Sequence, residues 1–256
     1  MDQMRTFEVL GTSLAATTYD EFTKFSQRLV QKPGTWAVDL TNTQVVTMRR
    51  HDPDFREITS AFDFFVPDGM PLIWCLNRKG ADLHDRVYGP AFMRYCLLNS
   101  PKPFTHYFIG GSDDCLARLK GVFRTANPDA QIIGARGGHI GFTPQPEIVD
   151  EINRLSPDFI WVGLGTPKQQ IWIHNHKPRI NRGVIFGVGF AFDVNAGTKK
   201  DAPLWMQHRG LTWVFRLFSE PRRLGPRYFK YNLLFLFYLA KDFLTRRDGK
   251  AQPISG

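Results

Sequence analysis

The sequence has few cysteines and no long hydrophobic run. Its three cysteines, Cys75, Cys96 and Cys115, have no C-x-x-C spacing, which argues against a disulfide framework or a zinc site and favours a reducing compartment. No stretch reaches the roughly 20 consecutive apolar residues that a membrane-spanning helix needs. The first residues lack the apolar core of a secretory signal peptide, so we expect no such leader.

Complete nucleotide-binding fingerprints are also missing. There is no Walker A sequence, which argues against an ordinary P-loop enzyme. The nearest match to the dinucleotide motif G-x-G-x-x-G is GVGFAF at 187–192, where phenylalanine replaces the third glycine. A nicotinamide-dependent oxidoreductase is therefore disfavoured, although it stays an alternative.

Positive charge is abundant and unevenly distributed. The 256 residues carry a formal net charge of +9, and residues 199–256 alone carry +8 of it. A basic C-terminal quarter indicates nucleic acid or an anionic membrane surface as the partner. Because large apolar side chains are interleaved with these arginines, beyond what a phosphate-tracking groove needs, we predict a membrane surface and no nucleic acid.

The C-terminal segment is expected to form an appendage of its own. Glu220 to Arg227 is predicted to be a basic turn, and Tyr228 to Leu244 is rich in Leu, Phe and Tyr. The apolar run from Leu233 to Ala240 is too short to span a bilayer but suits a helix lying in the interface. Packing on its own domain or on another subunit is the alternative, which leaves a homo-oligomer open. We divide the chain into a core, 1–197, and a basic amphipathic helical appendage, 198–256.

Strands, glycine turns and helices alternate through the middle of the chain. The expected strands are Trp36–Leu40, Phe64–Val66, Thr105–Ile109, Ala130–Ile133, Asp158–Val162 and Gly183–Phe186. This alternation predicts a Rossmann-like α/β fold, a mainly parallel sheet with helices on both faces. In such open sheets, ligands bind outside the carboxyl ends of the strands.

Asp68 follows one of these strands, in the stretch FFVPDGMPLIW. Pro67 cannot donate to a sheet ladder and ends the strand, and Asp68-Gly69 has turn chemistry. A helix is expected from Met70, with Pro71 in its first turn. Asp68 therefore lies where ligands bind in open sheets, and it can be interpreted either as a cap of this helix or as a general base.

Three glycine turns follow other strands: GG at 110–111, GLG at 163–165 and GVG at 187–189. Such turns let a ligand approach the backbone closely and offer free amide donors, so we predict that they bind a nucleoside diphosphate. The expected contacts are Gly110, Gly111, Gly163, Gly165, Gly187 and Gly189. Asp193, just past the last turn, is either a cap or a ligand contact.

Two short patterns resemble metal sites, and we interpret neither as one. Asp52-Pro53-Asp54 has the D-x-D spacing of many metal-dependent sugar transferases, but it could equally start a helix. His174 and His176 are two residues apart on an expected helix, where their directions differ by about 200°. We expect both histidines at the surface and no metal.

Six motifs in order resemble the WecG/TagA/CpsF family of bacterial glycosyltransferases. They are TN at 41–42, PDGMPLIW at 67–74, RVYGP at 86–90, GLGTPKQQIWI at 163–173, GVGFAFDVNAG at 187–197 and LTWVFRLFSEPRR at 211–223. The resemblance implies an inverting enzyme that needs neither metal nor cofactor. It would move a hexose, an N-acetylhexosamine or its uronic acid from a UDP-sugar to a saccharide on undecaprenyl diphosphate. It also implies peripheral attachment to the cytoplasmic face of the inner membrane, and PLIW with RVYGP looks like exopolysaccharide members.

The resemblance also assigns roles to residues. It makes Asp68 the catalytic base, places Thr41 and Asn42 in the active site, and matches Gln169 to the glutamine of a P-K-Q-E motif. We add Arg86, in RVYGP, as a substrate contact. The C-terminal arginines match an appendage that brings the enzyme to the membrane and closes the site over the lipid diphosphate. They are Arg216, Arg222, Arg223 and Arg227.

The chain departs from the family pattern in places. Gln170 replaces a usual glutamate, Asp201 a usual arginine and Ala91 a usual aspartate, which weakens any inference about the donor sugar. The alternative function is a non-catalytic nucleotide-binding or scaffold protein of the same fold at the membrane.

Overall fold

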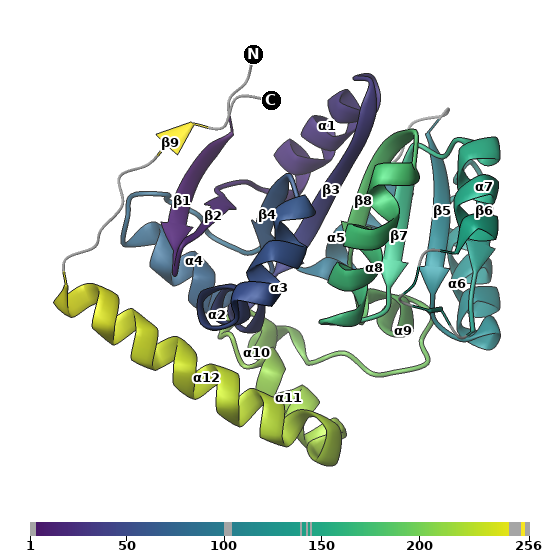
Figure 1. Ribbon diagram of the computed structural model, residues 1–256. Coiled ribbons are helices and arrows are strands. Elements are labelled where there is room, and N and C mark those ends of the chain that lie inside the picture. Colours follow the sequence, from purple (N-terminus) through teal and green to yellow (C-terminus); the bar gives the residue numbers. More distant parts are fainter. Residues whose placement is uncertain are drawn as a thin grey trace.

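A nine-stranded sheet runs through the computed structural model in the order β6-β5-β7-β8-β3-β4-β2-β1-β9 (Figure 1). The structure describes residues 4–99, 104–138, 140–141, 143 and 145–245, and the backbone of 252–253. The strands are β1 (Arg5–Val9), β2 (Thr12–Ala15), β3 (Gly34–Thr41), β4 (Phe64–Pro67), β5 (Thr105–Gly110), β6 (Gln131–Arg136), β7 (Phe159–Gly163), β8 (Arg182–Gly187) and β9 (Gln252–Pro253). From β6 to β4 every neighbouring pair is parallel.

Helices cover both faces of this sheet, as predicted. They are α1 (Tyr19–Val30), α2 (Thr43–His51), α3 (Pro53–Ile58), α4 (Met70–Asn77), α5 (Gly89–Leu98), α6 (Asp113–Ala126), α7 (Pro146–Leu155), α8 (Lys168–His176), α9 (Ala191–Asn195), α10 (Leu204–His208), α11 (Thr212–Ser219) and α12 (Pro221–Leu244). Core side chains of α1, α5, α6 and α9 pack on one face, and those of α2, α4, α7 and α8 on the other. The mainly parallel α/β fold is confirmed.

The central strands supply both layers of the core from near-continuous apolar sequence. In β3, Val38 and Leu40 belong to the cluster under α1 and α5, whereas Ala37 belongs to the cluster under α8. This alternation follows from the two-residue period of a strand, and a strand buried on both faces is apolar at every position. Asp39 interrupts the run and is 0% exposed.

The N-terminal hairpin was not among the predicted elements. β1 pairs antiparallel with β2, and Leu10 and Gly11 connect them with φ values of 50° and 78°. Two consecutive residues with positive φ form the turn that matches the twist of a two-residue hairpin. β2 then joins the parallel part through one bridge, from Leu14 to Phe65 of β4.

The C-terminal helices pack against the core along one side (Figure 1). α12 begins at Pro221, so the basic turn predicted for Glu220 to Arg227 is wrong: these residues form the first turns of a helix. Pro221 suits the first helical position, where no amide donor is needed, and the amide of Leu224 already donates to the Glu220 carbonyl at 3.0 Å. Among the described helices, none is both long and apolar enough to cross a membrane.

One face of α12 contacts α2. Phe235 is 5% exposed, and the Tyr238 hydroxyl lies 2.9 Å from Nδ1 of His51. Arg50 and Asp242 form an ion pair at 3.3 Å. The appendage is therefore joined to the core by apolar, hydrogen-bonded and ionic contacts.

Candidate active site

The predicted site residues follow adjacent strands and meet at one edge of the sheet. Thr41 at the end of β3 is level with Pro67 of β4, and Gly187 of β8 is level with Asp39 of β3. Gly110 of β5 is level with Gly163 of β7. In the sheet, β4 lies on one side of β3, whereas β5 and β7 lie on the other side. The chain therefore changes direction across the sheet here, and open sheets bind ligands at such a switch point.

Asp68 does not cap the helix that follows it. The N-cap of α4 is Gly69, which makes no side-chain cap bond, so the capping interpretation is wrong. Oδ1 of Asp68 instead accepts from the amide of Gly89, at the start of α5, at 3.1 Å. The amide of Asp68 donates to the carbonyl of Thr41 at 2.7 Å, so the carboxylate is tied to β3 and to α5.

The surroundings of Asp68 tune its acidity. Burial raises the pKa of Asp68 to about 7, while Arg86, the Gly89 amide and Arg216 act in the opposite direction. The residue as a whole has intermediate exposure. A carboxylate with a pKa near neutrality is matched to accepting a proton at physiological pH.

Thr41 is held by a buried carboxylate that the sequence analysis missed. The Thr41 hydroxyl donates to Oδ1 of Asp39 at 2.6 Å, and Nε2 of Gln170 donates to Oδ2 at 2.6 Å. Burial raises the pKa of Asp39, and these two hydrogen bonds and Arg49 oppose that effect. The signal in the sequence was a single acidic residue inside the apolar strand Trp36–Leu40.

Asn42 has a structural role that the structure shows directly. Its side-chain oxygen accepts from the amide of Val45 at 3.1 Å and caps α2. Its predicted substrate contact stays a prediction.

Two of the glycine turns close on each other around Gln169. A Cβ atom on Gly189 would lie 3.2 Å from Oε1 of Gln169 and 3.5 Å from Cα of Gly165, and one on Gly187 would lie 3.1 Å from Nε2 of Gln169. Gln169 is 4% exposed, and its Oε1 has no hydrogen-bond partner among the described atoms. A buried amide oxygen without a partner is uncommon in folded proteins and marks these turns as a place where a donor from a ligand would be stabilising.

The remaining glycine turn borders a cavity of about 390 Å³. The backbone of Gly110 has φ of 100°, and a Cβ there would lie 2.9 Å from the carbonyl oxygen of Gly163, so only glycine fits. The cavity is lined by Gly111, Ser112, Gly138, Ile140, Gly141, Gly163, Leu164 and Lys168. Its volume is within the range of small-molecule sites.

Asp193 lies inside α9 and does not cap a helix. Its carboxylate accepts from the Thr198 hydroxyl at 3.0 Å and lies 3.6 Å from the ammonium of Lys199. Lys199 also contacts Glu220 at 3.0 Å. Asp193 is thus the first member of an ion chain that ties the last glycine turn to the appendage.

Arg86 joins the core motif to the appendage. It is 5% exposed, its guanidinium lies 4.2 Å from the ring centre of Tyr88, and it donates to the hydroxyl of Thr212 at 3.0 Å. Thr212 is the first residue of α11, so the appendage is hydrogen-bonded to the arginine whose charge lowers the pKa of Asp68.

The predicted arginines of the appendage divide into two groups. Arg216 lies over the Phe190 ring at 4.1 Å, and Arg227 donates to Oε1 of Gln44 at 2.9 Å, both at the sheet edge. Arg222 and Arg223 are both exposed, and Arg223 pairs with Glu220. A second cavity of about 350 Å³ is lined by Phe190, Lys199, Lys200, Phe215, Arg216, Ser219 and Glu220.

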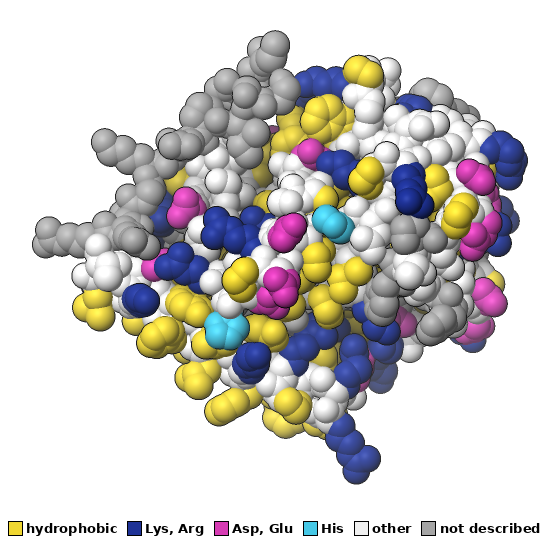
Figure 2. Space-filling view, in the orientation of Figure 1, with side chains coloured by type: hydrophobic (Ala, Val, Ile, Leu, Met, Phe, Trp, Pro, Cys, Tyr) yellow, Lys and Arg dark blue, Asp and Glu magenta, His cyan; other side chains and the backbone are white. Residues whose placement is uncertain are grey.

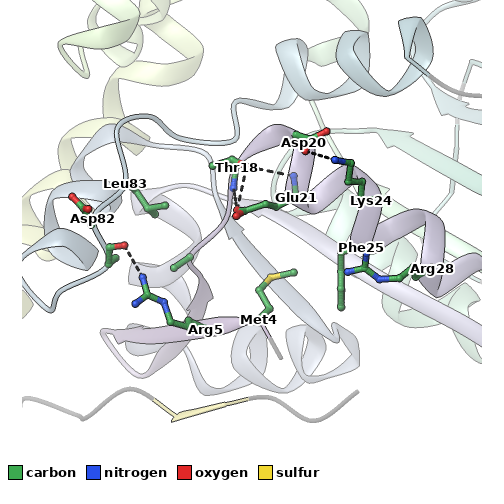
Figure 3. Close-up of a pocket in the computed structure, with 12 residues that line it drawn as sticks. Met4, Arg5, Thr18, Asp20, Glu21, Lys24, Phe25, Arg28, Asp82 and Leu83 are labelled. Atoms are coloured by element: carbon green, nitrogen blue, oxygen red, sulfur yellow. Dashed lines mark hydrogen bonds and ion pairs between the residues drawn. The ribbon is translucent and has the colours of Figure 1, made fainter. Parts of the chain in front are cut away.

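A third cavity, of about 510 Å³, contains none of the predicted site residues (Figure 3). Several charged side chains around it already have partners: Lys24 pairs with Asp20 at 2.7 Å, and Glu21 accepts from the backbone amide of Thr18 at 3.0 Å. Arg5 donates to the Ala81 carbonyl at 2.8 Å. We assign no ligand to this cavity.

A family model described as "Glycosyl transferase WecG/TagA/CpsF family" matches residues 7–249. The chain belongs to this family. It is a glycosyltransferase, and the match includes α10, α11 and α12, so the appendage is part of the family architecture.

Named enzymes are similar to this chain over most of its length. An N-acetylglucosaminyldiphosphoundecaprenol N-acetyl-beta-D-mannosaminyltransferase of Bacillus subtilis is 27% identical over 73% of this chain and 72% of its own. The enzyme of the same name from Bacillus spizizenii is 28% identical, over 76% and 75%. That from Staphylococcus aureus is 26% identical, over 78% of each chain. None of these three names mentions exopolysaccharide, so they lend no support to that predicted preference.

The two metal-like patterns of this WecG/TagA/CpsF member have structural roles. Oδ1 of Asp52 caps α3 by accepting from the amides of Asp54 at 3.0 Å and Phe55 at 3.1 Å. His176 is buried and stacks on Trp172 with ring centres 4.2 Å apart, so its predicted surface position is wrong. Within the described part of the chain, no three His, Cys, Asp or Glu side chains are grouped to hold a metal.

Proposed function

We propose that the protein transfers a hexose or N-acetylhexosamine from a UDP-sugar to a saccharide carried on undecaprenyl diphosphate, with inversion at the anomeric carbon. The names of the relatives suggest this acceptor class and make UDP-N-acetylmannosamine the first donor to test. The observation that carries the proposal is Asp68, a partly buried carboxylate at the ligand edge of the sheet, close to Arg86 and Arg216.

In this proposal Asp68 is the general base. Its carboxylate takes the proton of the acceptor hydroxyl while that oxygen attacks the anomeric carbon from the face opposite the UDP. The new glycosidic bond forms as the bond to the UDP oxygen breaks, and UDP leaves with the electron pair. The Gly89 amide orients one oxygen of Asp68, and the other can face the acceptor.

The leaving diphosphate needs positive charge or hydrogen-bond donors. Arg86, in the RVYGP motif, and Arg216, on α11, both act electrostatically on Asp68, and guanidinium groups can bind phosphate oxygens in pairs. Amides of the turn at 163–165 can add donors that are fixed before the reaction starts. The predicted free amides of the turn at 187–189 are not available, because Val188 and Gly189 donate to the Val162 carbonyl at 3.0 and 3.2 Å. Together, the two arginines and the turn at 163–165 support a reaction without a metal ion, with UDP-sugar as the donor and no cofactor.

The appendage supports a peripheral position at an anionic membrane surface, which we propose to be the cytoplasmic face of the inner membrane. Large apolar side chains of α10 to α12 are exposed and form a band along the lower edge of the molecule (Figure 2). They are Leu204, Trp205, Trp213, Phe218, Phe229, Leu233, Leu236, Phe237, Phe243 and Leu244. Exposed apolar side chains beside arginines are typical of helices that lie in the membrane interface. The product would then enter a cell-surface polysaccharide.

The test is transfer by the purified full-length protein to undecaprenyl-diphosphate-linked N-acetylglucosamine, with a panel of radiolabelled UDP-sugars. We expect label in the lipid and release of UDP for one preferred donor. Binding of UDP without transfer to any polyprenyl-diphosphate saccharide would support the scaffold alternative and overturn the proposal.

A further inference from the structure

Asp39 is a wholly buried carboxylate directly beneath the site. It lies on β3 two residues before Thr41, so the two side chains share one face of the sheet. α8 covers this face, and α8 supplies Gln170, which is also 0% exposed. A buried charge is costly unless donors surround it, so a carboxylate at this place needs a reason.

Two hydrogen bonds hold this carboxylate, and a third holds one of its two partners. Thr41 and Gln170 each donate to one carboxylate oxygen at 2.6 Å, and Gln170 also lies 3.3 Å from the Thr166 hydroxyl. Short bonds to an ionised acceptor are stronger than bonds between neutral groups. The side-chain rotamer of Thr41 is therefore fixed by its hydrogen bond to Asp39.

The base follows the neighbouring strand, β4, and is hydrogen-bonded to this end of β3. The carbonyl of Thr41 accepts from the amide of Asp68 at 2.7 Å, next to the point where Thr41 pairs with Pro67. A continuous path thus leads from the Asp39 carboxylate through the side chain and carbonyl of Thr41 to the backbone of Asp68. The charge of Asp39 also acts on Asp68 directly and favours its protonated form, against Arg86 and Arg216.

We propose that Asp39 is a positioning residue for the catalytic base: it fixes the end of β3, to which the backbone of Asp68 is hydrogen-bonded, and its charge offsets the pull of the two arginines on that base. The inference rests on the proposed role of Asp68. Neither the sequence motifs nor the relatives' names point to Asp39.

Other charged or titratable groups near the pair keep one state around neutral pH. Burial raises the pKa of Tyr19 to about 12 and raises that of Tyr88 further, so both stay neutral. Burial lowers the pKa of Arg49, the cation from α2 nearest Asp39, to about 10, and it stays charged. The pKa of Asp68, about 7, lies between pH 6 and 8.

The decisive variant is Asp39→Asn, which removes the charge and keeps the shape. The asparagine oxygen can still accept from Thr41, and its amide can donate to Oε1 of Gln170, which has no partner among the described atoms. We expect a folded protein with donor affinity within about twofold of wild type and kcat lower by about tenfold. The midpoint of the acid limb of kcat/KM should move to lower pH.

A second readout does not depend on turnover. Carboxyl-carbon NMR of protein labelled at aspartate, with the Asp68 signal assigned through Asp68→Asn, gives the titration of Asp68 itself. Asp39→Asn should lower its midpoint by about half a pH unit or more. If wild type shows no transferase activity, the proposed function fails, and this titration still decides whether Asp39 acts on Asp68.

The matched control is Asp63→Asn. Asp63 is a partly buried carboxylate near the other end of β3, where it accepts from the Ala37 amide at 2.6 Å and pairs with Lys177. Its loss should lower stability and leave the pH profile in place. An Asp68 midpoint and pH profile unchanged in Asp39→Asn would overturn the inference.

Gln170→Glu covers the case in which Asp39→Asn does not fold. It places a second carboxyl against Asp39, and two such groups share one proton until the pH is high enough to remove it. We expect near-normal activity at low pH and a new loss of activity as the pH rises above neutrality. A profile identical to that of wild type would equally overturn the inference.

Discussion

Helices α8 and α12 both carry aromatic and aliphatic side chains, and the molecule uses them differently. In α8, Trp172 and Ile173 are 0% exposed, and even Gln169 and Gln170 are buried against the strand ends. In α12, Phe235 is 5% exposed, while Leu236 is 63% and Phe237 57% exposed. The apolar side chains of α8 pack in the core and its polar side chains lie at the site, whereas many apolar side chains of α12 are exposed to solvent.

The difference shows that apolar content alone does not say what a helix is for. Large patches of exposed apolar side chains usually mark a surface that binds a partner or a membrane. Here the patch lies on α12, which also brings Arg227 to the site, next to α11, which brings Arg216. The catalytic edge and the proposed membrane surface should therefore be separable by mutation, although they are joined in space.

Asp68→Asn should have the largest effect, on chemistry alone. It keeps the hydrogen bond from the Gly89 amide but removes the base, so kcat should fall by about 10² to 10⁴. Binding of the UDP-sugar, measured by calorimetry, and binding to anionic liposomes should stay as in wild type. Asp54→Asn, an exposed position, serves as the control, and near-normal turnover by Asp68→Asn would reject the assignment.

Two neighbouring positions of α12 should separate attachment from folding. Leu236→Ser with Phe237→Ser should reduce sedimentation with anionic liposomes by tenfold or more, because apolar insertion contributes about 0.8 kcal/mol per buried CH₂. Thermal stability and transfer to a water-soluble acceptor should hardly change. Unchanged liposome binding would assign this face to a subunit contact or to no partner.

Phe235→Ala is the inward counterpart. Loss of a buried phenylalanine should lower the free energy of unfolding by about 3 kcal/mol, measured by denaturant titration. Liposome binding per folded molecule should persist. Because α12 covers α2, deletion of the whole helix would expose Val45 and Met48. The deletion would therefore disturb the core, and the single substitution is the better test.

The pH dependence of stability should reveal the buried base. The pKa of Asp68 is about 7 in the folded protein against 3.8 for an ordinary aspartate, so the folded state binds more protons between these values. Stability from this group is present below about pH 4 and is lost as the pH rises through 7. Asp68→Asn should therefore melt higher than wild type at pH 8, with a difference that shrinks toward pH 4. A constant difference would mean that Asp68 is not the group titrating.

We expect chelation of metal ions to have the smallest effect on activity. Since the Asp52 carboxylate caps α3, we expect full transferase activity in excess EDTA. Loss of activity that magnesium or manganese restores would promote Asp52 and Asp54 to metal ligands.

The parallel sheet and the meeting of its strand ends could be predicted, because apolar runs ending in glycine or Pro-Asp carry that information locally. Asp39 could not be given a role, because its partner Gln170 lies 131 residues away. The inner and outer faces of α12 were equally out of reach, since contact with α2 decides which side is covered. The burial of His176 likewise depends on Gln145, whose amide donates to it at 3.2 Å from another segment.

The hydrogen bond from Arg86 to Thr212 has a consequence for the reach of the enzyme. It ties the first turn of α11 to the motif that faces Asp68, and the ion chain from Asp193 through Lys199 to Glu220 adds a second tie. With the appendage resting on lipid, the catalytic edge would stand at a fixed height above the bilayer. The protein would then select its acceptor by length. It would accept a glycan whose free end extends to that height and would not act on shorter or longer chains.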